Sequence, residues 1–183
     1  MTLLVLGILL WWGAHLFKRV APGIRESMGT KGKGIVAVAL VLSIVLMVLG
    51  YRSAESFDLA LYPPFLQHIN NLLMLIALYF TSPGPSKGAL FYKMRHPMLF
   101  GFALWAVAHL LVNWDPASFV LFGGLLAWAL VEMVVINRAE PNWTPKLKGS
   151  IKKDAMFFAI SIVLLAVIGL IHGLIGPSPF PGG

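Results

Sequence analysis

Residues 155–175 read AMFFAISIVLLAVIGLIHGLI, a run of 21 residues that contains one histidine and no charged side chain. A helix needs about 20 mostly apolar residues to cross the hydrocarbon core of a bilayer. The run is apolar on every face, which differs from the alternating pattern of a membrane-spanning β-strand. This stretch therefore predicts a transmembrane helix.

Five further segments of the same kind precede this run and decide the fold class. They are Leu3–Phe17, Ile35–Tyr51, Phe65–Phe80, Pro97–Val112 and Ala117–Ile136. Hydrophobic residues make up 58% of the chain and charged residues only 11%, whereas a soluble domain carries roughly 25% charged residues. We expect an all-α polytopic membrane protein, a six-transmembrane-helix bundle. Residues 1–176 should form a single membrane domain, and residues 177–183 a short Pro/Gly tail.

The distribution of basic residues predicts an orientation. All but one of the 14 Lys and Arg residues lie in three alternate loops, within residues 18–33, 87–95 and 138–153, and Arg52 is the exception. Loops rich in Lys and Arg stay in the cytoplasm. Both termini are then expected on the outer, periplasmic side of a bacterial inner membrane. Anionic lipid accounts for the net charge of +7, so lipid is an expected partner and nucleic acid is not.

Polar residues inside apolar helices are costly, and each is a functional candidate. The set consists of His15, His68, Asn70, Asn71, His109, Glu132 and His172. At 1.5 Å per residue, His68, His109 and His172 lie roughly 6 Å below the outer boundary and His15 roughly 20 Å below it. Glu132 is expected to form an ion pair with Arg138. Gly101 and the pair Gly123-Gly124 are expected to allow close helix approach.

Histidine carries the only candidate chemistry. Neutral imidazole binds metals and is a good axial ligand for haem iron. Trp105 lies one turn before His109, and Trp11 one turn before His15, so aromatic rings accompany both histidines. The alternative is that these histidines only make hydrogen bonds between helices. The chain has no cysteine, which excludes thiolate metal sites and covalent haem attachment.

Two stretches resemble a known family. One is Gly13-Ala14-His15-Leu16-Phe17-Lys18-Arg19. The other is Met94-Arg95-His96-Pro97-Met98, followed by Gly101, Leu104-Trp105-Ala106-Val107-Ala108-His109 and Asn113. They resemble the NnrU family of bacterial membrane proteins and its plant relatives, the 15-cis-zeta-carotene isomerases. The resemblance covers most of the chain.

The resemblance implies a haem b protein. The plant isomerases use haem b to isomerise a cis double bond of a carotenoid precursor, and their axial histidines match His15 and His109. Their redox-linked ligand exchange uses a cysteine that is Ala106 here, so no thiolate is available. NnrU proteins are associated with nitric oxide metabolism and denitrification. A polyene and nitric oxide are thus both candidate substrates, Trp105, Arg95 and His96 are further candidate cofactor contacts, and His68 is a rival iron ligand.

Two other functions remain open. The Arg95-His96-Pro97 motif also occurs in membrane methyltransferases, for which Glu140 and Trp143 would be the only further motif residues after the fifth helix. The histidines could instead be structural in a non-enzymatic assembly factor for a respiratory complex. Arg95, Lys18 and Arg19 would bind lipid phosphates first and haem propionates second.

Overall fold

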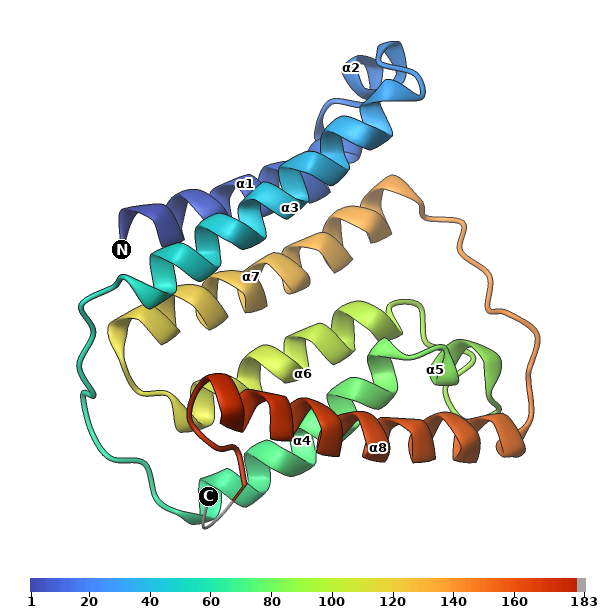
Figure 1. Cartoon of the computed structure of the whole chain (residues 1–183). Helices are drawn as coiled ribbons and strands as arrows, with labels where there is room; N and C mark the ends of the chain where they lie inside the picture. Colours follow the sequence, from blue (N-terminus) through green and yellow to red (C-terminus); the bar gives the residue numbers. More distant parts are fainter. Residues whose placement is uncertain (181–183) are drawn as a thin grey trace. The chain divides into compact units, whose positions relative to one another are not determined.

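The computed structural model describes residues 1–180, which contain helices and loops and no strand (Figure 1). The eight helices are α1 (Thr2–Val20), α2 (Pro22–Ser27), α3 (Lys31–Arg52), α4 (Phe65–Thr81), α5 (Gly84–Lys87), α6 (Pro97–Val112), α7 (Pro116–Ala139) and α8 (Ile151–Ile175). Six of them coincide with the predicted segments to within four residues at each end. The all-α prediction is therefore confirmed.

Helix lengths support a multi-pass membrane protein. The helices α1, α3, α7 and α8 are long and apolar enough to cross a membrane. The other two apolar helices, α4 and α6, have 17 and 16 residues. At 1.5 Å per residue they are about 25 Å long, somewhat short of a hydrocarbon core of about 30 Å. Six crossings and outward-facing termini stay predictions.

The surfaces of the long helices are apolar. On α3 the side chain of Val38 is 68% exposed, and on α8 those of Val163 and Leu170 are 61% and 65% exposed. Large apolar surfaces in contact with water are rare on soluble monomers. Lipid contact explains why these side chains need no cover from the protein itself.

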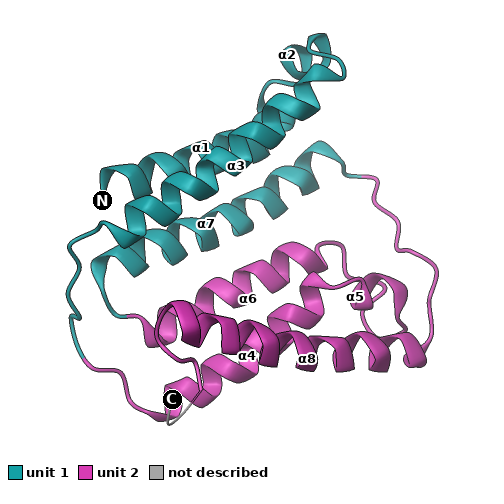
Figure 2. Cartoon of the chain, viewed as in Figure 1, with its two compact units in different colours: residues 1–60, 114–141 teal, residues 61–113, 142–183 magenta. Residues whose placement is uncertain are grey.

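The chain divides into two compact units (Figure 2). Unit 1 comprises Met1–Ala60 and Trp114–Pro141, and unit 2 comprises Leu61–Asn113 and Asn142–Gly183. The helices α1, α2, α3 and α7 thus belong to unit 1, and α4, α5, α6 and α8 to unit 2. The single membrane domain over residues 1–176 stays a prediction.

Unit 1 is built on α1, which packs against α3 and α7. A side chain at Gly50 would meet the backbone of Leu4, so α1 and α3 approach closely there. Trp12 joins α1 to α7, because its indole Nε1 donates to the Gly124 carbonyl at 3.0 Å. This cross-helix bond holds the middle of α1 against α7.

The start of α7 is fixed by its N-cap, Asp115. The Asp115 carboxylate accepts hydrogen bonds from the Ser118 amide at 3.0 Å and from the Ser56 hydroxyl at 2.6 Å. Burial alone would raise the pKa of Asp115, but these hydrogen bonds outweigh it and lower the pKa below its ordinary value. The cap thus favours the charged carboxylate.

Unit 2 is built on α4, which packs against α6 and α8. An added side chain at Gly101 of α6 would lie 2.7 Å from the Ala77 carbonyl oxygen of α4. Asp154, buried in the first turn of α8, accepts from the Tyr79 hydroxyl and the Ala89 amide, both at 2.6 Å. This carboxylate ties α4 and the loop after α5 to the start of α8.

The segment after α8 folds back within unit 2. His172 Nδ1 bonds the Pro177 carbonyl at 2.7 Å, and Asn71 Nδ2 donates to the Pro179 carbonyl at 2.9 Å. Phe180 lies against Gly169, where a side chain would collide with its ring. The first part of the predicted Pro/Gly tail is therefore packed on α4 and α8. The rest of that tail, residues 181–183, lies outside the described residues.

The ion pair expected between Glu132 and Arg138 is a prediction that the structure corrects. The Glu132 carboxylate lies 3.9 Å from the Arg19 guanidinium, which also donates to Glu140 at 3.1 Å. Glu132 is 5% exposed and faces α1 across the α1–α7 contact. A partner on a neighbouring helix could not be read from spacing along α7 alone.

Candidate functional site

His15 on α1 is surrounded by aromatic rings. Its Nδ1 bonds the carbonyl of Trp11 at 3.0 Å, one turn earlier on the same helix. The imidazole centroid lies 4.2 Å from the Trp11 ring and 4.5 Å from the Trp128 ring of α7. The two indoles hold the imidazole in one orientation within unit 1.

His109 on α6 repeats this arrangement in unit 2. Its Nδ1 bonds the carbonyl of Trp105 at 2.9 Å, and the two ring centroids lie 4.9 Å apart. Asn113 Nδ2 donates to the His109 carbonyl at 2.8 Å and closes the last turn of α6. Each histidine thus ends a W-x-x-x-H turn, a name we use for Trp11–His15 and Trp105–His109.

The hydrogen bonds of the W-x-x-x-H turns determine the tautomer. A carbonyl oxygen only accepts, so Nδ1 of each imidazole must carry the proton. In the neutral ring the lone pair is then on Nε2, the atom that faces away from the helix backbone. A hydrogen bond from the second ring nitrogen to a carbonyl is the usual support of a metal-binding histidine. Both His15 and His109 therefore have the tautomer in which Nε2 can bind a metal ion.

The remaining histidines have different surroundings. His68 is exposed on α4 and makes no hydrogen bond within residues 1–180. His172 is exposed on α8, and its Nδ1 is bonded to the Pro177 carbonyl outside the helix. His96 is the N-cap residue of α6. Neither His68 nor His172 is stacked on an indole in the described structure.

The candidate contacts Arg95 and His96 lie at the opposite end of α6 from His109. His109 is 13 positions after His96, which corresponds to roughly 20 Å along the helix. Arg95 lies over the Trp143 ring, 5.9 Å from its centroid. Of the predicted cofactor contacts in unit 2, only Trp105 is next to His109.

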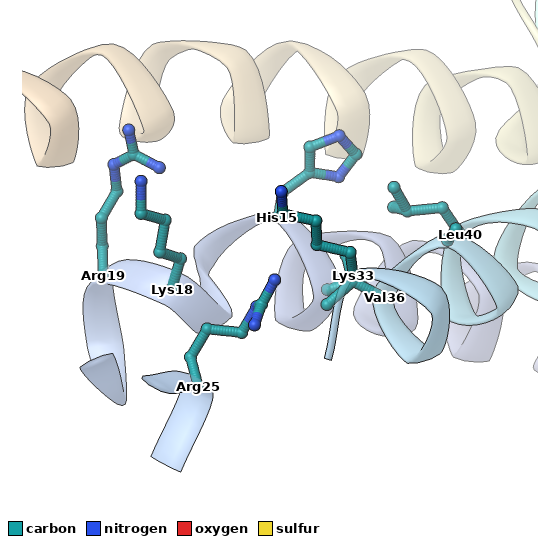
Figure 3. A pocket seen from close by; sticks show the side chains of 9 residues that line it. His15, Lys18, Arg19, Arg25, Lys33, Val36 and Leu40 are labelled. Carbon is teal, nitrogen blue, oxygen red and sulfur yellow. The ribbon is translucent and has the colours of Figure 1, made fainter. Parts of the chain in front are cut away.

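A pocket of about 370 Å³ lies beside His15 in unit 1 (Figure 3). Its walls come from the end of α1, from α2 and from the first half of α3. The lining residues are Ala14, His15, Lys18, Arg19, Arg25, Lys33, Val36, Ala37 and Leu40. Basic side chains and small apolar side chains thus share one cavity.

The donor set suits a group that brings its own equatorial ligands. Within residues 1–180, no three or more His, Asp or Glu side chains gather in a way that could hold a metal ion. A porphyrin supplies four nitrogen ligands itself and needs only one protein ligand on each face. His15 in unit 1 and His109 in unit 2 are each a supported imidazole of the kind that binds one face of such a group.

Several residues beside His15 have no counterpart in the sequence-based prediction. Trp128, which packs on His15, is on α7, more than 110 positions later in the chain. Arg25 of α2 and Lys33 of α3 line the pocket beside His15. Their basic character was visible, but only the α1–α3 packing places them next to His15.

These features define a class, a multi-pass α-helical membrane protein with two supported histidines on separate helices. The family model described as NnrU protein matches residues 3–179, so the chain belongs to the NnrU family. This confirms the resemblance carried by the two quoted motifs. Neither the curated proteins nor the solved structures include a match.

Proposed function

We propose that this NnrU-family protein binds haem b, with His15 and His109 as the two axial ligands of the iron. The repeated W-x-x-x-H turn carries the proposal. In both turns Nδ1 is bonded to the tryptophan carbonyl, and the indole packs on the imidazole. A histidine held in this way loses little further freedom when Nε2 binds a metal.

The residues around each histidine have defined tasks in this proposal. The Trp11 and Trp105 carbonyls fix the tautomer, and their indoles with Trp128 fix the ring planes. The apolar faces of the helices exclude water from the cofactor. Bound haem would supply an iron centre that changes its valence and binds small ligands such as nitric oxide.

Nitric oxide handling is our first candidate for the physiological role, and polyene isomerisation is the second. The ligand exchange of the plant isomerases needs a thiolate, and this chain has no cysteine. The corresponding position, Ala106, is fully buried on α6. A small diatomic ligand requires no thiolate and no wide entry for a long polyene.

The methyltransferase alternative ranks lower because Glu140, one of its two further motif residues, is bonded within unit 1, whereas the Arg95-His96-Pro97 motif belongs to unit 2. Glu140 accepts a hydrogen bond from Arg19 in unit 1. Trp143 lies against Arg95 in unit 2. A methyltransferase would bind S-adenosylmethionine, and saturable binding of that compound to the purified protein would support it over the haem proposal.

The proposal is tested by the absorption spectrum of the full chain, purified in detergent after expression with ample haem supply. We expect a Soret band in the natural protein and the loss of most of it in His15→Ala and in His109→Ala. The matched controls are His68→Ala and His172→Ala, which remove exposed histidines without a W-x-x-x-H turn. We expect both controls to keep the band.

Three results would contradict the proposal. A colourless natural protein would exclude a resident haem. Loss of the Soret band only in His68→Ala would show that His68, and not His15 or His109, is the histidine that haem binding requires. Full physiological function with both His15 and His109 replaced would favour the non-enzymatic assembly factor instead.

A further inference from the structure

The pocket beside His15 is a groove between one face of α1 and one face of α3. Lys33, Val36, Ala37 and Leu40 follow the spacing i, i+3, i+4, i+7, which places them on one side of α3. Lys18 and Arg19 are in the last turn of α1, and Lys33 is in the first turn of α3. One end of the groove is therefore cationic, and the other, toward Leu40, is apolar.

The cationic end has more positive charge than its protein partners neutralise. Arg19 pairs with Glu132 and Glu140, and Arg25 donates to the Gly29 carbonyl at 3.3 Å. Lys18 and Lys33 have no ion pair or hydrogen bond within residues 1–180. No Asp or Glu lines the groove.

Such a cavity suits an anion with an apolar continuation. Two ammonium groups without partners attract a phosphate oxygen, and the neighbouring Arg25 guanidinium adds a further donor. Val36, Ala37 and Leu40 offer an apolar wall of roughly 6 Å along α3. A cavity of about 370 Å³ is at the small end of the usual range for ligand sites, the size of a headgroup.

We propose that this groove binds the phosphate headgroup of an anionic phospholipid. The groove lies where the apolar surfaces of α1 and α3 give way to the basic loop, which is the depth of lipid phosphates. Figure 3 shows Lys18, Arg25 and Lys33 entering it from three different helices. His15 is one of the lining residues, whereas Lys18 and Lys33 are outside the W-x-x-x-H turns, so substitutions of these two lysines test lipid binding with both turns intact.

The test is a titration of the full chain in neutral detergent with phosphatidylglycerol, with phosphatidylcholine and with inorganic phosphate, followed by native mass spectrometry. We expect one saturable phosphatidylglycerol per chain, with phosphatidylcholine and inorganic phosphate at least tenfold weaker. A lysine near the phosphates contributes about a fivefold change in affinity. The double variant Lys18→Gln/Lys33→Gln should therefore bind roughly 25-fold more weakly.

The matched control is Lys31→Gln/Lys146→Gln, which removes the same net charge from exposed positions outside the groove. We expect this variant to bind phosphatidylglycerol as the natural protein does. Equal weakening in the two double variants would overturn the proposal, since net charge alone would then explain the binding. Inorganic phosphate that binds as tightly as phosphatidylglycerol would also overturn it, because the site would then recognise a free anion.

Discussion

At the scale of single residues, the two W-x-x-x-H turns are the main finding. The spacing of tryptophan and histidine is visible in the sequence, and so is the family motif around it. The bond from Nδ1 to the tryptophan carbonyl depends on the side-chain rotamer, which spacing does not determine. The structure adds that both imidazoles share one tautomer with Nε2 as the remaining acceptor.

A pH dependence is expected from Asp115, the N-cap of α7. Its folded-state pKa is lowered, so its contribution to stability is present at neutral pH and is lost as the pH falls through that pKa. We expect Asp115→Asn to be less stable than the natural protein at pH 7. Thermal unfolding in detergent, measured from pH 7 down to about pH 3, should show this difference shrinking with acidity.

The control for this measurement is Asp58→Asn, on the loop before α4. Asp58 is exposed and makes no hydrogen bond within the described residues. Its replacement should leave the pH profile of stability unchanged. A stability difference between natural protein and Asp115→Asn that stays constant across the pH range would contradict the role of the charged cap.

At the scale of helices, each unit depends on a glycine that lets two helices touch. In unit 1 Gly50 of α3 meets the backbone of Leu4, and in unit 2 Gly101 of α6 meets the backbone of Ala77 and Thr81. Gly101 was expected to allow close approach, and the structure shows it. Of the expected pair on α7, a side chain at Gly124 would contact Ile8, whereas a Cβ at Gly123 would meet no other element within 4 Å.

Substitution by alanine is expected to have different effects on stability at Gly101 and at Gly123. Gly101→Ala places a methyl group against two backbone atoms of α4, in Ala77 and Thr81, and should destabilise the protein by about 1–3 kcal/mol. Gly123→Ala meets nothing and should be neutral or stabilise by up to about 1 kcal/mol, through the better helix propensity of alanine. Denaturant or thermal unfolding in detergent measures both. Equal effects of the two substitutions would contradict the α4–α6 contact.

Helix positions were predictable because long apolar runs indicate membrane-spanning helices directly. The short helices α2 and α5 have no such run, although each begins with a proline in its first turn. The hydrogen bonds of the buried Asp154 could not be predicted from the sequence either, because its partners Ala89 and Tyr79 are 65 and 75 positions away in the chain. Contacts between distant segments decide these features, and a single sequence does not specify them.

At the scale of the whole molecule, the asymmetric distribution of basic residues predicts the orientation. A cysteine-free chain is suited to testing it, because a single introduced cysteine is then the only thiol. Leu61 and Leu147 are 89% and 94% exposed, in loops on opposite predicted sides. In intact cells, Leu61→Cys should react with a membrane-impermeant maleimide, and Leu147→Cys only after the membrane is permeabilised.

Labelling of Leu147→Cys but not of Leu61→Cys in intact cells would show that the orientation is the reverse of the predicted one. Labelling of both would show that the number of crossings between Leu61 and Leu147 is even, whereas α4, α6 and α7 predict three. The pocket beside His15 would keep its cationic side chains in each case, but its place at the cytoplasmic boundary requires the predicted orientation.

The most direct test of the haem proposal uses the natural protein without substitution. Magnetic circular dichroism and electron paramagnetic resonance of the oxidised protein report the spin state and the axial ligands of the iron. The account predicts one low-spin ferric haem per chain with the signature of two imidazole ligands. A protein without haem, or one whose iron is high-spin with a single histidine, would contradict it.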